Sequence, residues 1–510
     1  MLSIVKSYGL TGINGYMVKA EIDINQGLPG YDIVGLVGTA IKESKERVKS
    51  AIKNSGFQYP ILKITVNLAP ADTKKDGPIY DLAIAMGILS ASEQVSVNAV
   101  KDYIFLGELS LDGGIRKING VLPILIAARQ AGFTKIILPK ENEREASYID
   151  GLEVYAVNNL TECVDFLAGN KQLERVKLNN FVDAKKTNKQ SMDFKFVKGQ
   201  AKAKRALEIA AAGGHNVLMI GPPGSGKTML AKCFPSILPE LTFKEALEVT
   251  KIHSIAGVLD ANEGIITTRP FRSPHHTSTT LALTGGGRLA KPGEISLAHN
   301  GVLFLDEMPE YNRNSIETLR QPLEDGVITI SRVEATVEYP ANFTLIASMN
   351  PCPCGYYGSK ERECKCTPQN IHKYLHKLSG PLMDRIDIHI EVDNVTYNDL
   401  TSTTLEESSE SIKRRVDRAR KIQLDRYNNC GIYANAKMND QQVKTYCKLS
   451  PQSDMFLRQA FEKLKLSARA YNRILKVART IADLDGSENI MDDHIIEAIS
   501  YRSLDKKYWD

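Results

Sequence analysis

A glycine-rich segment in the middle of the chain has the residue types and spacing that bind a nucleotide. Its sequence, GPPGSGKT, follows the apolar segment NVLMI and precedes a helical pattern. In such a loop the glycines let backbone N–H groups surround phosphates at the positive end of a helix. The lysine reaches the β and γ oxygens and the threonine hydroxyl binds Mg²⁺. An ordinary glycine-rich turn is the alternative, but the strand and the helix are in the required places. The predicted ATP-binding residues of this loop are Gly221, Pro222, Pro223, Gly224, Ser225, Gly226, Lys227 and Thr228.

Two later apolar segments end in side chains that would complete a hydrolytic site. GVLFLDE ends in Asp306 and Glu307. We expect Asp306 to hold Mg²⁺ together with Thr228, and Glu307 to polarise the attacking water. FTLIASMN ends in Asn350, whose amide would orient that water beside the γ-phosphate. Each pattern alone also fits a solvated strand end or a turn, but their order after the phosphate loop favours the catalytic interpretation.

A cysteine cluster begins two residues after Asn350. Two Cys-x-Cys pairs are separated by nine residues, and Pro353 and Gly355 would provide the turn that lets neighbouring sulfurs converge. Four thiolates can close a tetrahedral structural Zn²⁺ site. Inert thiols and a redox pair are the alternatives, and His372 and His376 are possible substitute ligands. We favour zinc, with Cys352, Cys354, Cys364 and Cys366 as its ligands.

Length and composition set the general class of the protein. A chain of 510 residues is longer than one hydrophobic core usually serves, so several domains are expected. The 43% hydrophobic and 25% charged residues are typical of a globular protein, and a formal net charge of +5 neither requires nor excludes nucleic acid. The sequence has no segment resembling a signal peptide or a membrane span. We therefore expect a cytoplasmic protein without membrane contact.

Periodicity divides the chain into a multidomain α/β protein. Residues 1–168 alternate short apolar runs with helical patterns, and residues 169–193 are polar, basic and almost without periodicity, which predicts a linker. Residues 194–395 form a second α/β unit with a cysteine-rich insertion at 351–367. Residues 396–510 show helical spacing and predict a helical domain.

Several motifs around these sites resemble one family. The phosphate loop is followed in order by FRSPHHTS, GEISLAHNGVLFLDE, ASMNPCPCG, SGPLMDRIDIHI and LSARAYNRILKVARTIADL. This order resembles the magnesium-chelatase-like AAA+ ATPases, and most closely the bacterial competence-associated ComM/YifB proteins. The resemblance covers essentially the whole chain. It implies an N-terminal α+β domain like that of Lon protease, a P-loop AAA+ α/β domain and a C-terminal helical lid.

The resemblance also implies roles for residues outside the phosphate loop. Arg385 matches an arginine finger that reaches the γ-phosphate in a neighbouring subunit, which implies a homo-oligomeric ring, expected to be a hexamer. Arg469 matches a second sensor that closes the helical lid onto the nucleotide. The segment before the phosphate loop would lie near the adenine, with contacts from Val197, Gly199 and Gln200.

The N-terminal domain is similar to Lon protease but lacks its catalytic residues. At the positions of the Lon serine nucleophile and lysine base this chain has Ile79 and Ile124. A Ser–Lys mechanism needs a hydroxyl activated by a neutral amine, and isoleucine supplies neither. We expect no peptidase activity and a scaffolding role for this domain.

The family also implies what the motor acts on. ComM-like proteins are ring helicases that drive branch migration during recombination in natural transformation, so the expected partner is single-stranded or branched DNA. A protein-remodelling motor or a metal-chelatase type of motor is the alternative. The basic segment 413–426 fits DNA contact, although such a helix is more often a solvated face or a subunit contact. For His275 and His276 we expect hydrogen-bonding or substrate contacts in preference to a metal.

Overall fold

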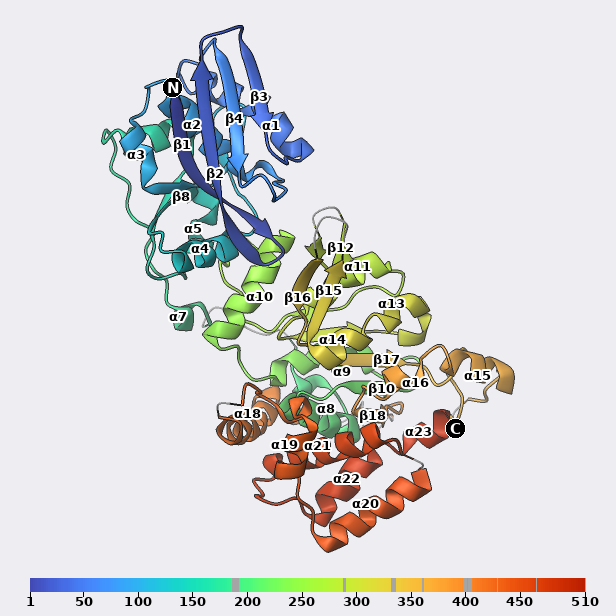
Figure 1. Ribbon diagram of the computed structural model, residues 1–510. Helices are drawn as coiled ribbons and strands as arrows, with labels where there is room; N and C mark the ends of the chain where they lie inside the picture. The colour runs from blue at the N-terminus through green and yellow to red at the C-terminus, as the bar shows by residue number, and fades with distance from the viewer. Residues whose placement is uncertain are drawn as a thin grey trace.

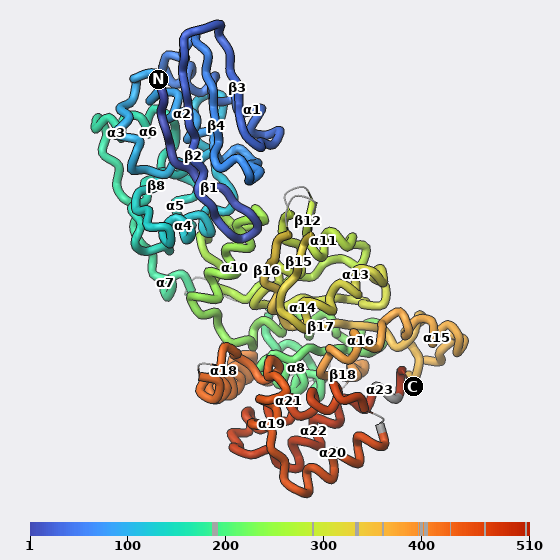
Figure 2. The backbone as a smooth tube through the Cα atoms, in the orientation of Figure 1, coloured from blue at the N-terminus to red at the C-terminus, as the bar shows by residue number. Residues whose placement is uncertain are grey.

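The chain builds two α/β units and a helical unit in sequence order, as the computed structural model shows (Figure 1). The structure describes residues 1–185, 192–287, 290–331, 336–359, 362–395, 397, 401, 406–428, 430–464 and 466–509. The chain runs from the N-terminal unit through the central unit to the helical unit (Figure 2), and its end returns to the central unit, where Tyr508 joins a hydrophobic core cluster. The predicted multidomain α/β architecture is thereby confirmed.

The N-terminal unit is built on a mixed seven-stranded sheet. The buried positions of β4 (Lys63–Ala69) alternate with less buried ones, which is the period expected of a strand. The strand order is β3-β4-β2-β1-β5-β8-β9, in which β1–β2 and β2–β4 pair antiparallel and the other neighbours pair parallel. The other strands are β1 (Leu2–Thr11), β2 (Asn14–Asn25), β3 (Gly30–Val34), β5 (Tyr103–Phe105), β8 (Lys135–Pro139) and β9 (Glu153–Val157); a small hairpin joins β6 (Glu108–Leu109) and β7 (Ile115–Arg116).

Helices pack on this sheet and complete its core. Every residue of α2 (Asp81–Ala91) is buried, because the helix is apolar all round and lies between the sheet and α1 (Thr39–Asn54). The remaining helices are α3 (Val97–Lys101), α4 (Val121–Gln130), α5 (Glu143–Ala146) and α6 (Leu160–Leu167).

The segment expected to be a linker is held against its neighbours over most of its described length. The backbone N–H of Val176 donates to the carbonyl O of Val154 at 2.8 Å, beside the edge strand β9. The Val176 side chain is buried in the N-terminal core. Farther along, the ring of Phe181 in α7 (Phe181–Lys185) contacts the ring of Phe243 in α10 (Phe243–Ala256). The connection therefore packs on both α/β units.

The central unit is a parallel five-stranded sheet in the order β11-β14-β17-β10-β18. Of its middle strands, β10 and β14 are apolar throughout and β17 is apolar except for Thr344 and Ser348, as expected for a parallel sheet covered on both faces. The strands are β10 (Val217–Ile220), β11 (Phe271–Arg272), β14 (Val302–Leu305), β17 (Thr344–Met349) and β18 (Ile388–Glu391). The helices are α8 (Ala201–Gly213), α9 (Lys227–Cys233), α10, α11 (Thr280–Thr284), α12 (Glu294–Leu297), α13 (Arg313–Glu317), α14 (Arg320–Asp325), α15 (Pro368–Leu375) and α16 (Gly380–Met383).

Two antiparallel hairpins project from this unit on the side of the N-terminal domain (Figure 1). One joins β12 (Gly285–Gly286) and β13 (Lys291–Pro292), and the other joins β15 (Val327–Ser331) and β16 (Thr336–Pro340). Gly12, in the turn between β1 and β2, lies directly on Val337: a Cβ built on Gly12 would be 2.3 Å from a Val337 methyl group. The N-terminal domain thus touches the β15–β16 hairpin.

The C-terminal unit is a helical layer that covers α8 and β18. Its long helix α21 (Ala468–Leu484) packs against α8, α18 (Ser409–Arg426) and α22 (Asp492–Ser500). A common hydrophobic core joins these helices to the central sheet. The other helices are α19 (Asp440–Tyr446), α20 (Pro451–Leu464) and α23 (Leu504–Tyr508).

Candidate nucleotide-binding and hydrolysis site

The carboxyl ends of three neighbouring strands bring the predicted hydrolytic residues together. Strand β10 leads into the phosphate loop. Strand β17 lies next to it and is followed by Asn350, and β14 lies next to β17 and is followed by Asp306. The Lys227 Nζ is 3.4 Å from the Asn350 Oδ1, and the Thr228 hydroxyl donates to the Asp306 Oδ2 at 2.8 Å. Residues that are far apart in the sequence therefore share one edge of the sheet.

Thr228 and Asp306 fit a Mg²⁺ site. Their oxygens already lie at hydrogen-bond distance, and a hydroxyl paired with a carboxylate is the usual protein contribution to a Mg²⁺ bound with nucleotide phosphates. A residue that sequence reasoning missed supports this arrangement. The Ser348 hydroxyl donates to the Asp306 Oδ1 and accepts from the Glu307 backbone N–H at 3.2 Å. In the sequence, Ser348 is marked only by its position two residues before Asn350.

Lys227 is bound by its own loop. Its Nζ donates to the carbonyl oxygens of Gly221 and Pro222, each at 2.8 Å. Burial lowers the pKa of Lys227 to about 8, and the nearby carboxylates of Asp306 and Glu307 oppose that shift. A phosphate would replace these carbonyl contacts with a charged partner.

Glu307 is placed for contact with solvent and substrate. Its side chain is exposed, and its backbone lies in the left-handed region at φ 50°, which is uncommon for a residue other than glycine. The conformation turns the chain out of β14 directly after Asp306. Residues in such sparsely populated regions cluster at functional sites.

The segment expected near the adenine contacts the phosphate loop and the chain that follows β18. The Gln200 amide donates to the carbonyl oxygens of Ser225 at 3.3 Å and Asp393 at 2.5 Å. The Gly199 backbone N–H donates to the Glu406 Oε1 at 3.0 Å, and Val197 is buried. Glu406, which no motif indicated, belongs to the segment that leads into the lid.

The four cysteines of the insertion form one cluster. The Cys352 sulfur is 3.3 Å from that of Cys354 and 3.7 Å from that of Cys364, and the Cys354 and Cys364 sulfurs are 3.6 Å apart. All four sulfurs, including that of Cys366, lie within 4.8 Å of one another. A Zn–S bond of about 2.3 Å places tetrahedral sulfurs about 3.8 Å apart, so the cluster fits a single Zn²⁺. His372 and His376 contact each other, and the described residues form no metal cluster that includes them.

The insertion rests on the phosphate loop. A Cβ built on Gly355 would be 2.5 Å from the Cδ of Pro223, so only glycine allows this approach. On its other side the insertion meets the last helix, where the rings of Tyr357 and Tyr508 are in contact. The cysteine cluster thus lies between the phosphate loop, Asn350 and the C-terminal helix α23.

Arg385 lies at the opposite edge of the sheet from Lys227. The Asn216 amide, just before β10, donates to the Arg385 carbonyl O at 3.0 Å, whereas Gly221 follows the same strand. Four strand residues span about 13 Å, so Arg385 is far from the phosphates of its own subunit. Its guanidinium pairs with Glu324, and the charge of Arg469 adds to the lowering of the Glu324 pKa. The charge of Arg469 thus acts on the carboxylate that pairs with Arg385, and no described contact joins Arg469 to Lys227.

The basic segment 413–426 forms α18, and most of its charges are used within the subunit. Arg415 pairs with Glu208 and Glu407, and Arg426 pairs with the buried Asp483. Burial lowers the pKa of Arg420 to about 10, and its guanidinium donates to backbone carbonyls. This pattern supports the structural interpretation of the helix over direct DNA contact.

The histidine pair His275 and His276 stack on each other with ring centres 4.1 Å apart. The His275 Nδ1 is 2.8 Å from the Thr277 hydroxyl, and the His276 ring meets Tyr311 edge-on. These contacts agree with the hydrogen-bonding role expected for the pair, and the metal clusters found among the described residues do not include it.

In the N-terminal domain, Ile79 and Ile124 pack in the same hydrophobic cluster. Ile124 is fully buried and Ile79 is partly buried. Hydrocarbon therefore fills the two positions that the resemblance to Lon assigns to the serine and lysine of that protease.

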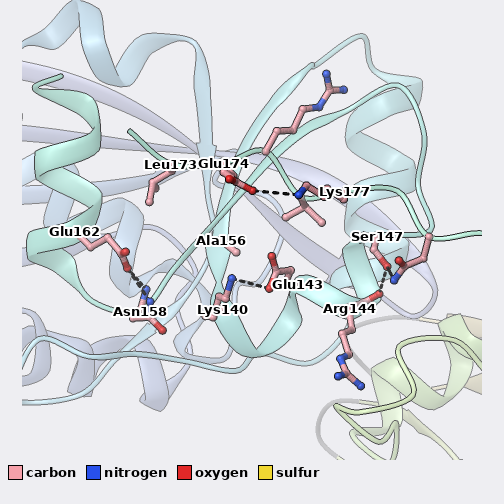
Figure 3. Close-up of a pocket in the computed structure, with 13 residues that line it drawn as sticks. Lys140, Glu143, Arg144, Ser147, Ala156, Asn158, Glu162, Leu173, Glu174 and Lys177 are labelled. Atoms are coloured by element: carbon pink, nitrogen blue, oxygen red, sulfur yellow. Dashed lines mark hydrogen bonds and ion pairs between the residues drawn. The ribbon is translucent and has the colours of Figure 1, made fainter. Parts of the chain in front are cut away.

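A cavity of about 510 Å³ lies beside α5 and β9, where residues 173–179 cross the N-terminal sheet edge (Figure 3). Its charged side chains are of both signs, and two ion pairs, Lys140–Glu143 and Lys177–Glu174, neutralise much of the charge. The cavity is in the N-terminal unit, whereas the phosphate loop is in the central unit. Because its lining carries both signs of charge, it does not favour a ligand of one charge.

Comparison with known proteins agrees with this architecture. Three family models match in succession: subunit ChlI of Mg-chelatase at residues 20–142, magnesium chelatase subunit ChlI at 193–400, and its C-terminal part at 406–502. Competence protein ComM from Haemophilus influenzae is 44% identical over 510 residues, 99% of this chain and 98% of ComM. Protein YifB from Escherichia coli K12 is 44% identical over 506 residues, with the same coverage. Lon protease 2 from Bacillus subtilis is 33% identical over 135 residues, 26% of this chain and 24% of that protease.

The phosphate loop on a five-stranded parallel sheet, with these matches, defines an AAA+ ATPase of the magnesium chelatase type, a class that implies ATP hydrolysis. Within this class, the chain belongs to the YifB/ComM family. Across the part of the chain that the structure describes, no helix is both long and apolar enough to cross a membrane.

Proposed function

We propose that this protein is an ATP-driven ring motor that acts on DNA, as a helicase that promotes branch migration during recombination or natural transformation. The observation that carries its ATPase part is the convergence of Lys227, Thr228, Asp306 and Asn350 at one sheet edge, with Glu307 beside them. The DNA part is supported by the similarity to ComM, which is described as a competence protein.

The side chains have separate roles in hydrolysis. Bound Mg²⁺ neutralises phosphate charge, and Thr228 and Asp306 would hold it. Lys227 would bind the β and γ oxygens, Asn350 would orient the attacking water and Glu307 would accept its proton. Val197, Gly199 and Gln200 would line the base. Arg469, whose charge acts on Glu324 in this structure, would become a sensor of the nucleotide when the helical lid closes onto it.

The test is an ATPase and branch-migration assay with Glu307→Gln as the control. Loss of the general base should lower hydrolysis about 100-fold or more while ATP binding persists. Hydrolysis that survives in this variant contradicts the role of Glu307. Wild-type hydrolysis without any response to single-stranded or branched DNA favours the alternative, a protein-remodelling or chelatase-type motor whose N-terminal domain recruits the client.

A ring follows if Arg385 completes the site of a neighbouring subunit. Its position at the sheet edge opposite Lys227 supports this role, since the strand separates it from its own phosphates. Mixing Arg385→Ala subunits with Lys227→Ala subunits should then restore activity, because about a quarter of randomly formed interfaces would combine an intact lysine with an intact arginine. Two inactive parents that stay inactive when mixed, in assemblies of mixed composition, contradict an arginine finger in trans.

We also infer that the insertion holds one structural Zn²⁺ on Cys352, Cys354, Cys364 and Cys366. The support is the packing of the four sulfurs within 4.8 Å. Metal analysis of untagged protein should find one zinc per chain, and the double change Cys364→Ser and Cys366→Ser should remove it. Cys430→Ser, at an exposed cysteine outside the cluster, should leave it bound. Wild-type protein without zinc contradicts the inference and favours inert thiols or a redox pair.

A further inference from the structure

The guanidinium of Arg385 is held inside its own subunit. Its Nη1 donates to the Pro381 carbonyl O at 2.6 Å, and its Nη2 forms an ion pair with the Glu324 carboxylate. Only 11% of the Arg385 side chain is exposed, against 54% of the Glu324 side chain. In this conformation the terminal nitrogens are occupied, so Arg385 must leave Glu324 before it can bind a phosphate elsewhere.

Glu324 is the acid that faces this group of arginines. Its pKa is lowered, first by the hydrogen bond from Arg385 and then by the charges of Arg385, Arg469 and Arg473. The nearby Asp387 is already used by Arg473, His215 and the Asn216 backbone N–H. Among the described contacts, Glu324 is therefore the carboxylate that pairs with the Arg385 guanidinium.

The helix that carries Glu324 is connected to the β15–β16 hairpin. Glu324 lies near the end of α14, and Gly326, at φ +69°, turns the chain directly into β15. The Gln321 amide donates to the Thr329 hydroxyl at 3.3 Å, which fixes α14 to that strand. A displacement of the hairpin would therefore move Glu324.

The same helix also holds the segment that carries Arg385. The Arg320 guanidinium donates to the Ser379 hydroxyl at 2.8 Å, at the start of α16. Arg385 follows α16 by two residues. Two contacts, Arg320–Ser379 and Glu324–Arg385, thus join α14 to the arginine segment. Because β16 also touches Gly12 of the N-terminal domain, a continuous path of contacts leads from that domain to Arg385.

We propose that Glu324 is a latch that restrains Arg385 in the resting subunit and competes with the neighbouring subunit's ATP for its guanidinium. This inference rests on the proposed function, because it needs Arg385 to act in trans. A carboxylate and a phosphate are alternative partners for a guanidinium, and the phosphate carries more charge. An ion pair with a half-exposed acid is weak, so the exchange is reversible. Movement of the hairpin on contact with the client would withdraw Glu324 and free Arg385.

The test measures ATP hydrolysis by the full-length protein without DNA. Glu324→Gln should raise the basal rate about two- to fivefold, the range expected for losing a partly exposed ion pair. The matched control is Asp325→Asn, which removes the same charge at the next residue of α14, an exposed position, and should leave the rate unchanged.

The double variant Glu324→Gln with Arg385→Ala should be as slow as Arg385→Ala alone, because the gain depends on Arg385. Glu324→Asp keeps the charge on a shorter side chain and should also raise the rate, which provides a second reading if Glu324→Gln folds poorly.

Two results would contradict the latch and leave the proposed function standing. An unchanged rate in well-folded Glu324 variants means that the ion pair does not restrain Arg385. A lower rate means that Glu324 positions Arg385 for catalysis. If the wild-type protein shows no hydrolysis that depends on Glu307, the proposed function and the latch both fail, so the two failures are distinguishable.

Discussion

At the scale of single residues, the polar groups of the hydrolytic site are hydrogen-bonded to one another and to their own loop. Lys227 donates to carbonyl oxygens of its own loop, and Thr228 donates to Asp306. Ser348 links the Asp306 carboxylate to the Glu307 backbone. These contacts keep the polar groups hydrogen-bonded while holding them close to the positions that a nucleotide requires.

The lowered pKa of Lys227 predicts that nucleotide affinity depends on pH. Only the charged lysine attracts phosphate, and binding raises its pKa, so affinity is greatest below pH 8 and falls as the pH rises through 8. Between pH 7 and pH 9 the dissociation constant of a non-hydrolysable ATP analogue should increase about tenfold.

The matched control for this prediction is Lys227→Arg. Arginine stays charged between pH 7 and pH 9, so loss of charge should not lower the affinity of the variant over this range. At pH 7 the variant should bind the ATP analogue more weakly than the wild type. Equal pH dependence in the wild type and in Lys227→Arg would show that another group is responsible. Equilibrium titration by fluorescence or calorimetry measures the dissociation constants of both proteins.

At the scale of elements, the cysteine insertion is a support for the phosphate loop. Cys352 follows Asn350 by two residues, and Gly355 packs on Pro223. The insertion also reaches α23 through Tyr357 and Tyr508. It therefore joins three parts of the fold that surround the nucleotide position.

Two glycines of the insertion give a matched test of this support. Gly355 and Gly358 both have left-handed backbone, at φ +85° and +76°, so alanine strains each by about 1–2 kcal/mol. Only at position 355 would the added Cβ collide with the phosphate loop. Gly355→Ala should therefore weaken binding of an ATP analogue by about tenfold, corresponding to an overpacking cost of about 1–3 kcal/mol, whereas Gly358→Ala should keep its affinity. Thermal unfolding separates the shared backbone strain from the loss of binding, and equal affinities in the two variants would contradict the contact's role.

At the scale of the whole molecule, the N-terminal domain is docked on the ATPase by buried polar contacts. The Ser254 hydroxyl of α10 donates to the Glu145 carboxylate at 2.5 Å and accepts from the Gly120 backbone N–H at 3.0 Å. Burial raises the pKa of Glu145, although Ser254, the Leu122 N–H and Asn142 all donate to it and oppose that shift. Buried hydrogen bonds thus join the N-terminal domain to the ATPase domain.

Removing the Ser254 hydroxyl should weaken this attachment. Ser254→Ala leaves a buried carboxylate and a backbone N–H each without one partner, which should cost about 1–3 kcal/mol of stability and lower the Tm. Ser296→Ala is the control, because its buried hydroxyl has no hydrogen-bond partner among the described residues and its loss should change the Tm little. In calorimetry, Ser254→Ala should also separate the unfolding of the N-terminal domain from that of the ATPase. A Tm equal to that of Ser296→Ala would contradict this coupling.

The residues of the hydrolytic site and the fold class follow from local patterns in the sequence. The spacing from Gly221 to Thr228, the acids at the end of β14 and the amide at the end of β17 are local patterns, because each follows one apolar strand. Parallel strands place such ends at one edge, so the hydrolytic set could be predicted without coordinates. Isoleucine at positions 79 and 124 likewise excluded a Ser–Lys dyad by side-chain chemistry alone.

Which distant groups meet depends on how the strands and helices pack. Glu406 and Glu324 belong to no motif, and Ser348 is marked only by its position before Asn350, because the partners of all three come from elsewhere in the chain. The basic residues of α18 looked available for DNA, yet packing against Glu208, Glu407 and Asp483 uses several of them. Arg385 was recognised from its motif, but its restraint by Glu324 and its distance from Lys227 follow from sheet order and helix packing, which local sequence patterns do not encode.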